Sequence, residues 1–79
     1  MFRIKMPHHM RSQINLDWDR ETKCYHLSEH DFDSVASLLN HWNLSSEGIV
    51  AFRDGCQLEL TEPVQNGDLI KVSFMTIGG

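Results

Sequence analysis

The chain ends in two glycines, Gly78 and Gly79, which are the residues with the clearest chemical use. At an average glycine usage of about 7%, a pair in the last two places arises by chance in roughly 0.5% of chains. Glycine has no Cβ, so a glycine tail passes through a narrow channel and adopts backbone angles that are closed to other residues. We therefore expect residues 75–79 to be a flexible tail in which the Gly79 carboxylate reacts and Gly78 provides clearance.

A free carboxylate is a poor electrophile and must be activated before a nucleophile attacks it. Acyl-adenylation by ATP is the natural route, because AMP is a far better leaving group than oxide. The chain has no Gly-rich phosphate-binding loop, so we expect a partner to supply both ATP and its Mg²⁺. We predict no intrinsic cofactor and no enzymatic activity for this chain, which would be a cosubstrate of its partners.

Cysteine and histidine residues offer a second constellation, formed by Cys24-x-His26 with His30 and Cys56. Structural zinc sites usually combine paired Cys or His elements, and only the His26 to His30 spacing qualifies here. A 2Fe–2S cluster generally needs four cysteine ligands, and the chain has two. We predict no metal site; a buried cysteine and surface histidines explain these residues as well. Reduced thiols are the default expectation, and the sequence leaves a 24–56 disulfide open.

Hydrophobic periodicity predicts the elements that position the tail. Ile14, Leu16 and Trp18 alternate with polar residues, which is typical of a half-buried strand, although Trp18 also suits an interface anchor. The predicted elements are a β-prone stretch at 2–6, a hairpin of strands at 14–18 and 22–27, a helix at 33–42, and strands at 48–53, 57–60 and 69–74.

The predicted helix carries one apolar stripe, which we assign to the core: Phe32, Val35, Leu38, Leu39 and Trp42. Asp31, Asp33 and Ser34 stand at its start, and each could accept a hydrogen bond from a first-turn N–H. We interpret the two aspartates as helix-capping residues, not as a catalytic carboxylate pair.

One helix packed on one mixed sheet of four to five strands is an α+β arrangement, and in this element order it is the β-grasp, or ubiquitin-like, fold. We expect residues 1–79 to form a single domain. Two arrangements stay open for the N-terminus: residues 1–11 precede a first strand near 13–18, or they hold the first strand of an enlarged hairpin.

The composition is mildly acidic, with 11 Asp and Glu against 7 Lys and Arg, and the cations are scattered along the chain. Nucleic-acid binders usually show a basic face, so we expect no nucleic-acid partner. No segment reaches the roughly 20 apolar residues of a membrane span, and no signal-peptide core is present. We expect a cytoplasmic protein without a membrane partner.

The C-terminal part of the chain resembles the ThiS and MoaD family of sulfur carriers. Pro63, the turn 66–68 and the terminal Gly-Gly stand at the relative spacing of that family, and residues 34–39 are similar to the start of its helix. The resemblance covers roughly residues 33–79. The N-terminal third matches poorly, and the tail lacks the Pro-Pro that usually precedes the end of MoaD. The short loop 43–47 is more similar to ThiS, whereas the compact segment 57–65 is more similar to MoaD.

The resemblance implies that Gly79 is adenylated by an enzyme related to ubiquitin-activating enzymes and is converted to a thiocarboxylate. A sulfur donor such as a cysteine desulfurase supplies the sulfur, and an acceptor synthase receives it. It slightly favours the thiazole of thiamine over molybdopterin as the product. Two other functions stay open: a non-conjugating β-grasp interaction module, and a ubiquitin-like modifier ligated through Gly79.

A sulfur carrier of this kind needs a docking surface for its partners. We expect this surface on the apolar part of the outer sheet, continued by the tail, and formed by Phe52, Leu58, Leu60, Phe74 and Ile77.

Overall fold

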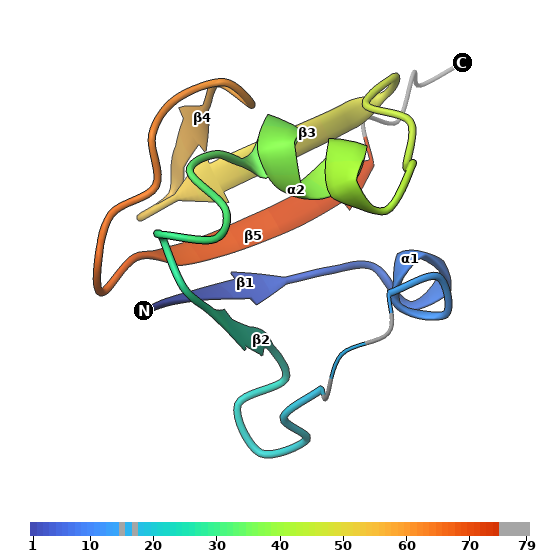
Figure 1. Ribbon diagram of the computed structural model, residues 1–79, viewed down its shortest axis with the longest axis horizontal. Coiled ribbons are helices and arrows are strands. Elements are labelled where there is room, and N and C mark those ends of the chain that lie inside the picture. The colour runs from blue at the N-terminus through green and yellow to red at the C-terminus, as the bar shows by residue number, and fades with distance from the viewer. Residues whose placement is uncertain (15, 17, 75–79) are drawn as a thin grey trace.

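The computed structural model describes residues 1–14, 16 and 18–74. They form a five-stranded mixed sheet with one main helix across one face, which confirms the predicted α+β class (Figure 1). The elements in chain order are β1 (Phe2–Lys5), α1 (His8–Arg11), β2 (Tyr25–Leu27), α2 (Val35–His41), β3 (Ile49–Arg53), β4 (Cys56–Leu58) and β5 (Leu69–Phe74).

The strand order across the sheet is β2-β1-β5-β3-β4. β1 runs antiparallel to β2 and parallel to β5, and β3 runs antiparallel to both β5 and β4. The last strand in the sequence therefore lies in the middle of the sheet. Its Ile70 pairs with Ile4 of β1, and both side chains are fully buried.

The predicted strand at 14–18 is wrong, because β2 pairs with β1 and the stretch between them is a long connection. Its alternating pattern arises from other contacts: Ile14 is buried in the core, Leu16 is exposed, and the Trp18 ring packs edge-on against Tyr25 at a centroid distance of 4.8 Å. The enlarged first hairpin, one of the two predicted arrangements, is therefore correct. Asn15 and Asp17 lie outside the described residues.

The helical turn α1 was not predicted, because its residues are mostly polar. The Pro7 carbonyl accepts hydrogen bonds from the N–H groups of Met10 at 3.1 Å and Arg11 at 3.3 Å. Met10 is 4% exposed and belongs to the core cluster, so one apolar side chain holds this turn against the domain.

Helix α2 is shorter than the predicted 33–42, and of the three cap candidates at its start Ser34 is the one that caps it. The Ser34 hydroxyl accepts a hydrogen bond from the Ser37 N–H at 3.1 Å, and no acidic residue lies in the first turn. The expectation that Asp31 and Asp33 cap the helix is therefore wrong. The Asp33 carbonyl instead accepts a hydrogen bond from the Val64 N–H at 2.9 Å.

The other end of α2 closes with a left-handed residue, Asn43, at φ 55°. The Asn43 N–H donates to the Asn40 carbonyl at 3.1 Å and the Leu44 N–H donates to the Leu39 carbonyl at 2.8 Å. This pair of bonds satisfies two carbonyls that the helix end would leave unpaired. Helix α2 therefore ends at His41, one residue before the predicted end at 42.

The core lies between α2 and the inner face of the sheet. Val35, Leu38 and Leu39 of the helix are each 1% exposed, and Phe32 and Trp42 stack on each other at its margin, as the apolar stripe predicted. From the sheet, the buried side chains are Phe2, Ile4, Tyr25, Leu27, Ile49, Ala51, Leu58, Ile70 and Val72.

The C-terminal strands follow the prediction closely. β5 has the predicted bounds, and β3 differs by one residue. Asp54 (φ 53°) and Gly55 (φ 79°) form the two-residue turn between β3 and β4, and two positive φ values in succession are typical of a tight hairpin turn. β4 begins one residue earlier and ends two residues earlier than predicted.

Candidate functional site

The predicted reactive residues, Gly78 and Gly79, and the predicted contact residue Ile77 lie outside the described residues. What the structure describes is the strand that leads to them. β5 occupies the central position of the sheet and ends at Phe74, five residues before Gly79. The predicted site therefore follows the strand that is held on both sides, by β1 and by β3.

The predicted docking residues do not form one surface. Leu58 is 3% exposed and pairs with buried Ala51, so its side chain faces the core and its assignment to the outer face is wrong. Phe74 pairs with buried Ile49, and partners in an antiparallel ladder share a face. Phe74 therefore lies on the helix side of the sheet, where its 41% exposure reflects its place at the strand end.

Of the described residues in that prediction, only Phe52 is on the outer face. It alternates with the buried residue Ala51 along β3, so its side chain points to the opposite side of the sheet from α2. Leu60 follows β4 and packs partly buried against the core. The sequence alone did not show which apolar side chains of β3 face outward. Apolar residues occupy both faces of this strand, so no alternation of apolar and polar residues marks its buried face.

The outer face carries basic side chains that the sequence pattern did not reveal. Lys5, Lys71, Phe52 and Gln57 are consecutive register partners across β1, β5, β3 and β4, so they form one row on this face. Arg3 and Leu69 form the neighbouring row. The cations therefore do not stay scattered in the fold: three of the seven in the chain, Arg3, Lys5 and Lys71, share one face.

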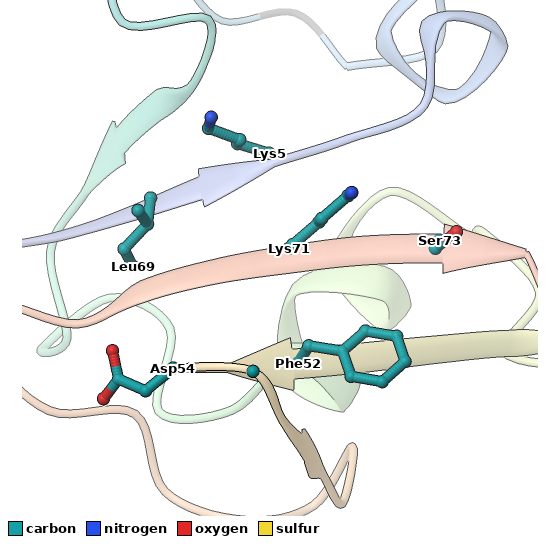
Figure 2. A pocket seen from close by; sticks show the side chains of 7 residues that line it. Lys5, Phe52, Asp54, Leu69, Lys71 and Ser73 are labelled. Atoms are coloured by element: carbon teal, nitrogen blue, oxygen red, sulfur yellow. The ribbon is translucent and has the colours of Figure 1, made fainter.

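A shallow groove of about 430 Å³ runs along this outer face. Figure 2 shows its lining side chains in front of the sheet, with α2 behind: Lys5, Phe52, Asp54, Leu69, Lys71 and Ser73. We call this surface the basic groove. Its floor combines an aromatic and an aliphatic side chain with two ammonium groups, a combination that suits an amphipathic acidic partner.

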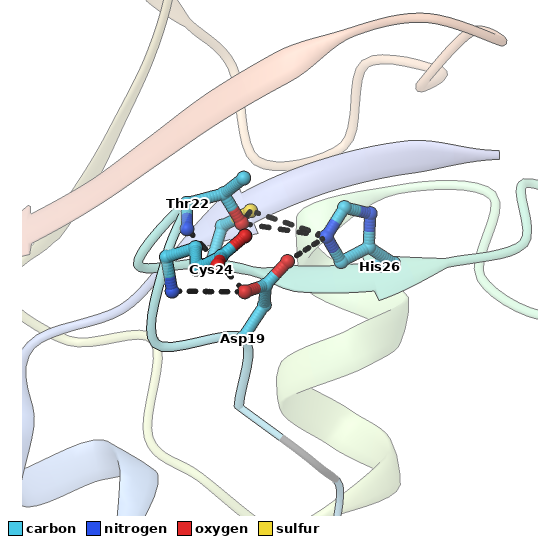
Figure 3. A network of polar contacts seen from close by, with 5 residues as sticks. Asp19, Thr22, Cys24 and His26 are labelled. Atoms are coloured by element: carbon cyan, nitrogen blue, oxygen red, sulfur yellow. Dashed lines mark hydrogen bonds and ion pairs between the residues drawn. The ribbon is translucent and has the colours of Figure 1, made fainter.

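A second group of polar residues lies at the β2 edge of the sheet, where the 19–24 loop meets β2 (Figure 3). His26 Nε2 is 3.0 Å from Asp19 Oδ2 and 3.8 Å from Cys24 Sγ, and Thr22 Oγ1 is 3.0 Å from the same sulfur. The Asp19 carboxylate and the Cys24 thiol both contact Nε2 of His26. A relay through the imidazole would need one group at each ring nitrogen, so this arrangement does not pass a proton from the thiol to the carboxylate. We interpret these contacts as structural: they hold the 19–24 loop against β2, and we call the group of Asp19, Thr22, Cys24 and His26 the loop tie.

Asp19 is the charged centre of the loop tie. Hydrogen bonding from the Thr22 side chain, and then from His26, lowers the pKa of Asp19 to about 2 from its ordinary value of 3.8. Because the folded state favours the charged carboxylate, Asp19 stabilises the fold above about pH 3.8. This contribution is lost as the pH falls toward about 2.

Of the residues considered for zinc, Cys24 and His26 lie together, and His30 and Cys56 do not join them. Among the residues that the structure describes, no group of three His, Cys, Asp or Glu side chains is arranged to hold a metal ion. His30 lies 3.6 Å from Glu29, away from the loop tie. Cys56 is in β4 at one edge of the sheet, and Cys24 adjoins β2 at the other.

Both cysteines are free thiols, and three strands at about 4.8 Å spacing separate their edges, so a 24–56 disulfide is geometrically excluded. Cys24 is fully buried whereas Cys56 is exposed. We predict that a thiol reagent such as Ellman's reagent modifies Cys56 rapidly in the native protein and Cys24 only after denaturation. Cys56→Ser is expected to remove the fast phase alone. Two fast equivalents in native buffer would contradict the described burial of Cys24.

Comparisons of the chain with models of known protein families, with curated proteins and with solved structures find no match. Among the described residues, no helix has both the length and the apolar character needed to cross a lipid bilayer.

Proposed function

We propose that this chain is a β-grasp sulfur carrier whose Gly79 carboxylate is the working group. The observation that carries the proposal is the position of Gly78 and Gly79 in the sequence, four and five residues beyond the end of the central strand in a sheet of order β2-β1-β5-β3-β4. A hairpin, a helix crossing one face and a returning central strand are the elements of the β-grasp fold. This arrangement supports the fold assignment that the C-terminal sequence pattern suggested.

The proposed chemistry proceeds in three steps, all on partner proteins. A Gly79 oxygen attacks the α-phosphorus of ATP, and pyrophosphate leaves to form an acyl-adenylate. A persulfide carried by the donor then displaces AMP from the acyl carbon and forms an acyl disulfide. A second thiol, on the donor or the adenylating enzyme, attacks the donor sulfur of that disulfide, so that a disulfide remains on the proteins and the Gly79 thiocarboxylate is released. The adenylating enzyme supplies the nucleotide site and Mg²⁺, a donor such as a cysteine desulfurase supplies sulfur, and an acceptor synthase consumes it.

In this scheme the chain is a cosubstrate, and its fold serves to present the tail. A sheet held by a core of 16 buried hydrophobic side chains gives the partner a rigid body to grip while the glycines enter the catalytic channel. The thiazole of thiamine is the favoured product, with molybdopterin as the alternative, and the cytoplasm is the proposed location because ATP and reduced sulfur donors are available there.

Intact-mass spectrometry tests the proposal. The chain is incubated with an adenylating enzyme of this class, Mg·ATP and a sulfur source, and the protein is weighed. We expect a gain equal to the replacement of one oxygen by sulfur, dependent on ATP. An unchanged mass with every active partner enzyme tried would refute the sulfur carrier and favour a non-conjugating interaction module. Isopeptide-linked products would instead identify a modifier ligated through Gly79.

A further inference from the structure

Lys5 and Lys71 face each other on neighbouring strands of the outer face. They are register partners in the parallel ladder between β1 and β5, and like charges placed directly opposite each other destabilise a sheet. The ion pairs among the described residues include neither lysine. In Figure 2 the two ammonium groups point in opposite directions along the strands, as mutual repulsion favours. Among the described residues, the free protein thus carries a like-charge pair with no carboxylate within ion-pair distance of either ammonium group.

The basic character extends beyond this pair. Arg3 lies two residues before Lys5 on the same face of β1 and enters none of these ion pairs either. The chain as a whole has a formal charge of −4, so these three cations stand out from an acidic protein. Among the described residues, Asp54 at the hairpin tip is the one carboxylate that lines the groove.

We propose that the basic groove binds an acidic polypeptide segment that also carries apolar side chains. Carboxylates of this segment would lie against Lys5, Lys71 and Arg3 and relieve their repulsion, while its apolar side chains would cover Phe52 and Leu69, of which Leu69 is 37% exposed. The inference rests on the proposed function in one respect: it assigns the acidic segment to a partner protein that activates Gly79 or receives its sulfur.

A polypeptide fits this surface better than a nucleic acid does. Nucleic-acid affinity is built from many phosphate contacts, whereas this face offers three cations on a protein of formal charge −4. The groove floor is also partly apolar, through Phe52 and Leu69. An amphipathic acidic segment satisfies both parts of the surface at once.

The test is an NMR titration of the ¹⁵N-labelled chain with a capped ten-residue peptide of glutamate and leucine. Two further arms use the same peptide with lysine in place of glutamate and a ten-nucleotide deoxythymidine oligomer. We expect the acidic peptide alone to shift the backbone amides of β1, β3 and β5 that carry the groove residues. No shifts, shifts spread over other faces, or equal binding of the oligonucleotide at this face would overturn the inference.

Charge reversal distinguishes binding from a structural role. Lys71→Glu is expected to weaken peptide binding at least about tenfold, because it places a carboxylate against an acidic partner. The same variant is expected to raise the midpoint of thermal unfolding, since Lys5 then faces a carboxylate. Arg20→Glu makes the same charge change at an exposed residue of the 19–24 loop and should leave peptide affinity within about twofold. If both variants weakened peptide binding equally, the peptide would be responding to the net charge of the protein alone, and the assignment of the basic groove as the binding site would be overturned.

These measurements use neither ATP nor Gly79. Peptide binding without sulfur transfer would therefore refute the proposed function alone, and sulfur transfer without peptide binding would refute the acidic segment alone.

Discussion

Extension of the chain beyond Gly79 is expected to lower thiocarboxylate formation by at least about a hundredfold. Activation requires the terminal carboxylate oxygen to attack the α-phosphorus of ATP, and an added peptide bond converts that carboxylate into an amide. Replacement of Gly79 by valine should act in the same direction for a different reason, because a branched side chain displaces the reacting atoms, and a displacement of about 1 Å can cost a hundredfold in rate. The measurement is the fraction of protein that carries sulfur by intact mass.

A cleavable fusion provides the matched control for this prediction. A C-terminal tag joined through a protease site that leaves Gly79 as the last residue should block sulfur loading before cleavage and permit it afterwards. The thermal midpoint of the valine variant should match that of the parent, because residue 79 lies beyond the last element of the described core. Full sulfur loading of the uncleaved fusion would show that the Gly79 carboxylate is not the group that accepts sulfur.

Replacement of Ile70 by alanine is expected to lower the free energy of unfolding by about 2–5 kcal/mol, the usual cost of deleting a buried aliphatic side chain. Ile70 is fully buried on the central strand, between Ile4 of β1 and Arg53 of β3 in the ladder register. A domain of this size loses roughly 4–8 °C of thermal midpoint for each kcal/mol, so the loss is large against a typical total stability of about 5–15 kcal/mol. Chemical denaturation followed by tryptophan fluorescence measures it.

Leu69→Ala is the matched control, since it removes a similar number of atoms from the adjacent residue. Leu69 lies on the outer face and is 37% exposed, so we expect a cost below about 1 kcal/mol. The ratio of the two effects reports the register of β5, because a shift of one residue would exchange the faces of the two side chains. A larger loss from Leu69→Ala than from Ile70→Ala would contradict the described ladder. Ile70→Val, at about 0.5–1.5 kcal/mol, keeps the comparison measurable if Ile70→Ala does not fold.

Local patterns were sufficient for the C-terminal half of the fold. The helix stripe follows from residues three and four apart, and the Asp54-Gly55 turn follows from the backbone freedom of its residues. β5 was predicted with its observed bounds, because alternation and flanking turns are encoded within a few residues of the strand.

The N-terminal hairpin could not be derived in this way. β2 finds its partner about twenty residues earlier, across α1 and the loop that carries Trp18, and such pairing depends on contacts that are not local in sequence. The alternation of Ile14, Leu16 and Trp18 is genuine, but it results from a loop that packs on the core and on Tyr25.

The sequence by itself therefore determined which segments are apolar on one side, where the main helix and the three C-terminal strands of the described residues lie, and that Gly78 and Gly79 follow β5 in the sequence. Only the tertiary structure decided which strands are neighbours, which apolar side chains of the sheet face outward, and that Lys5 and Lys71 meet across 66 residues of chain. The reason is physical: periodicity is set by bonds between near neighbours, whereas the faces and rows of a sheet are set by pairing between strands that are distant in sequence.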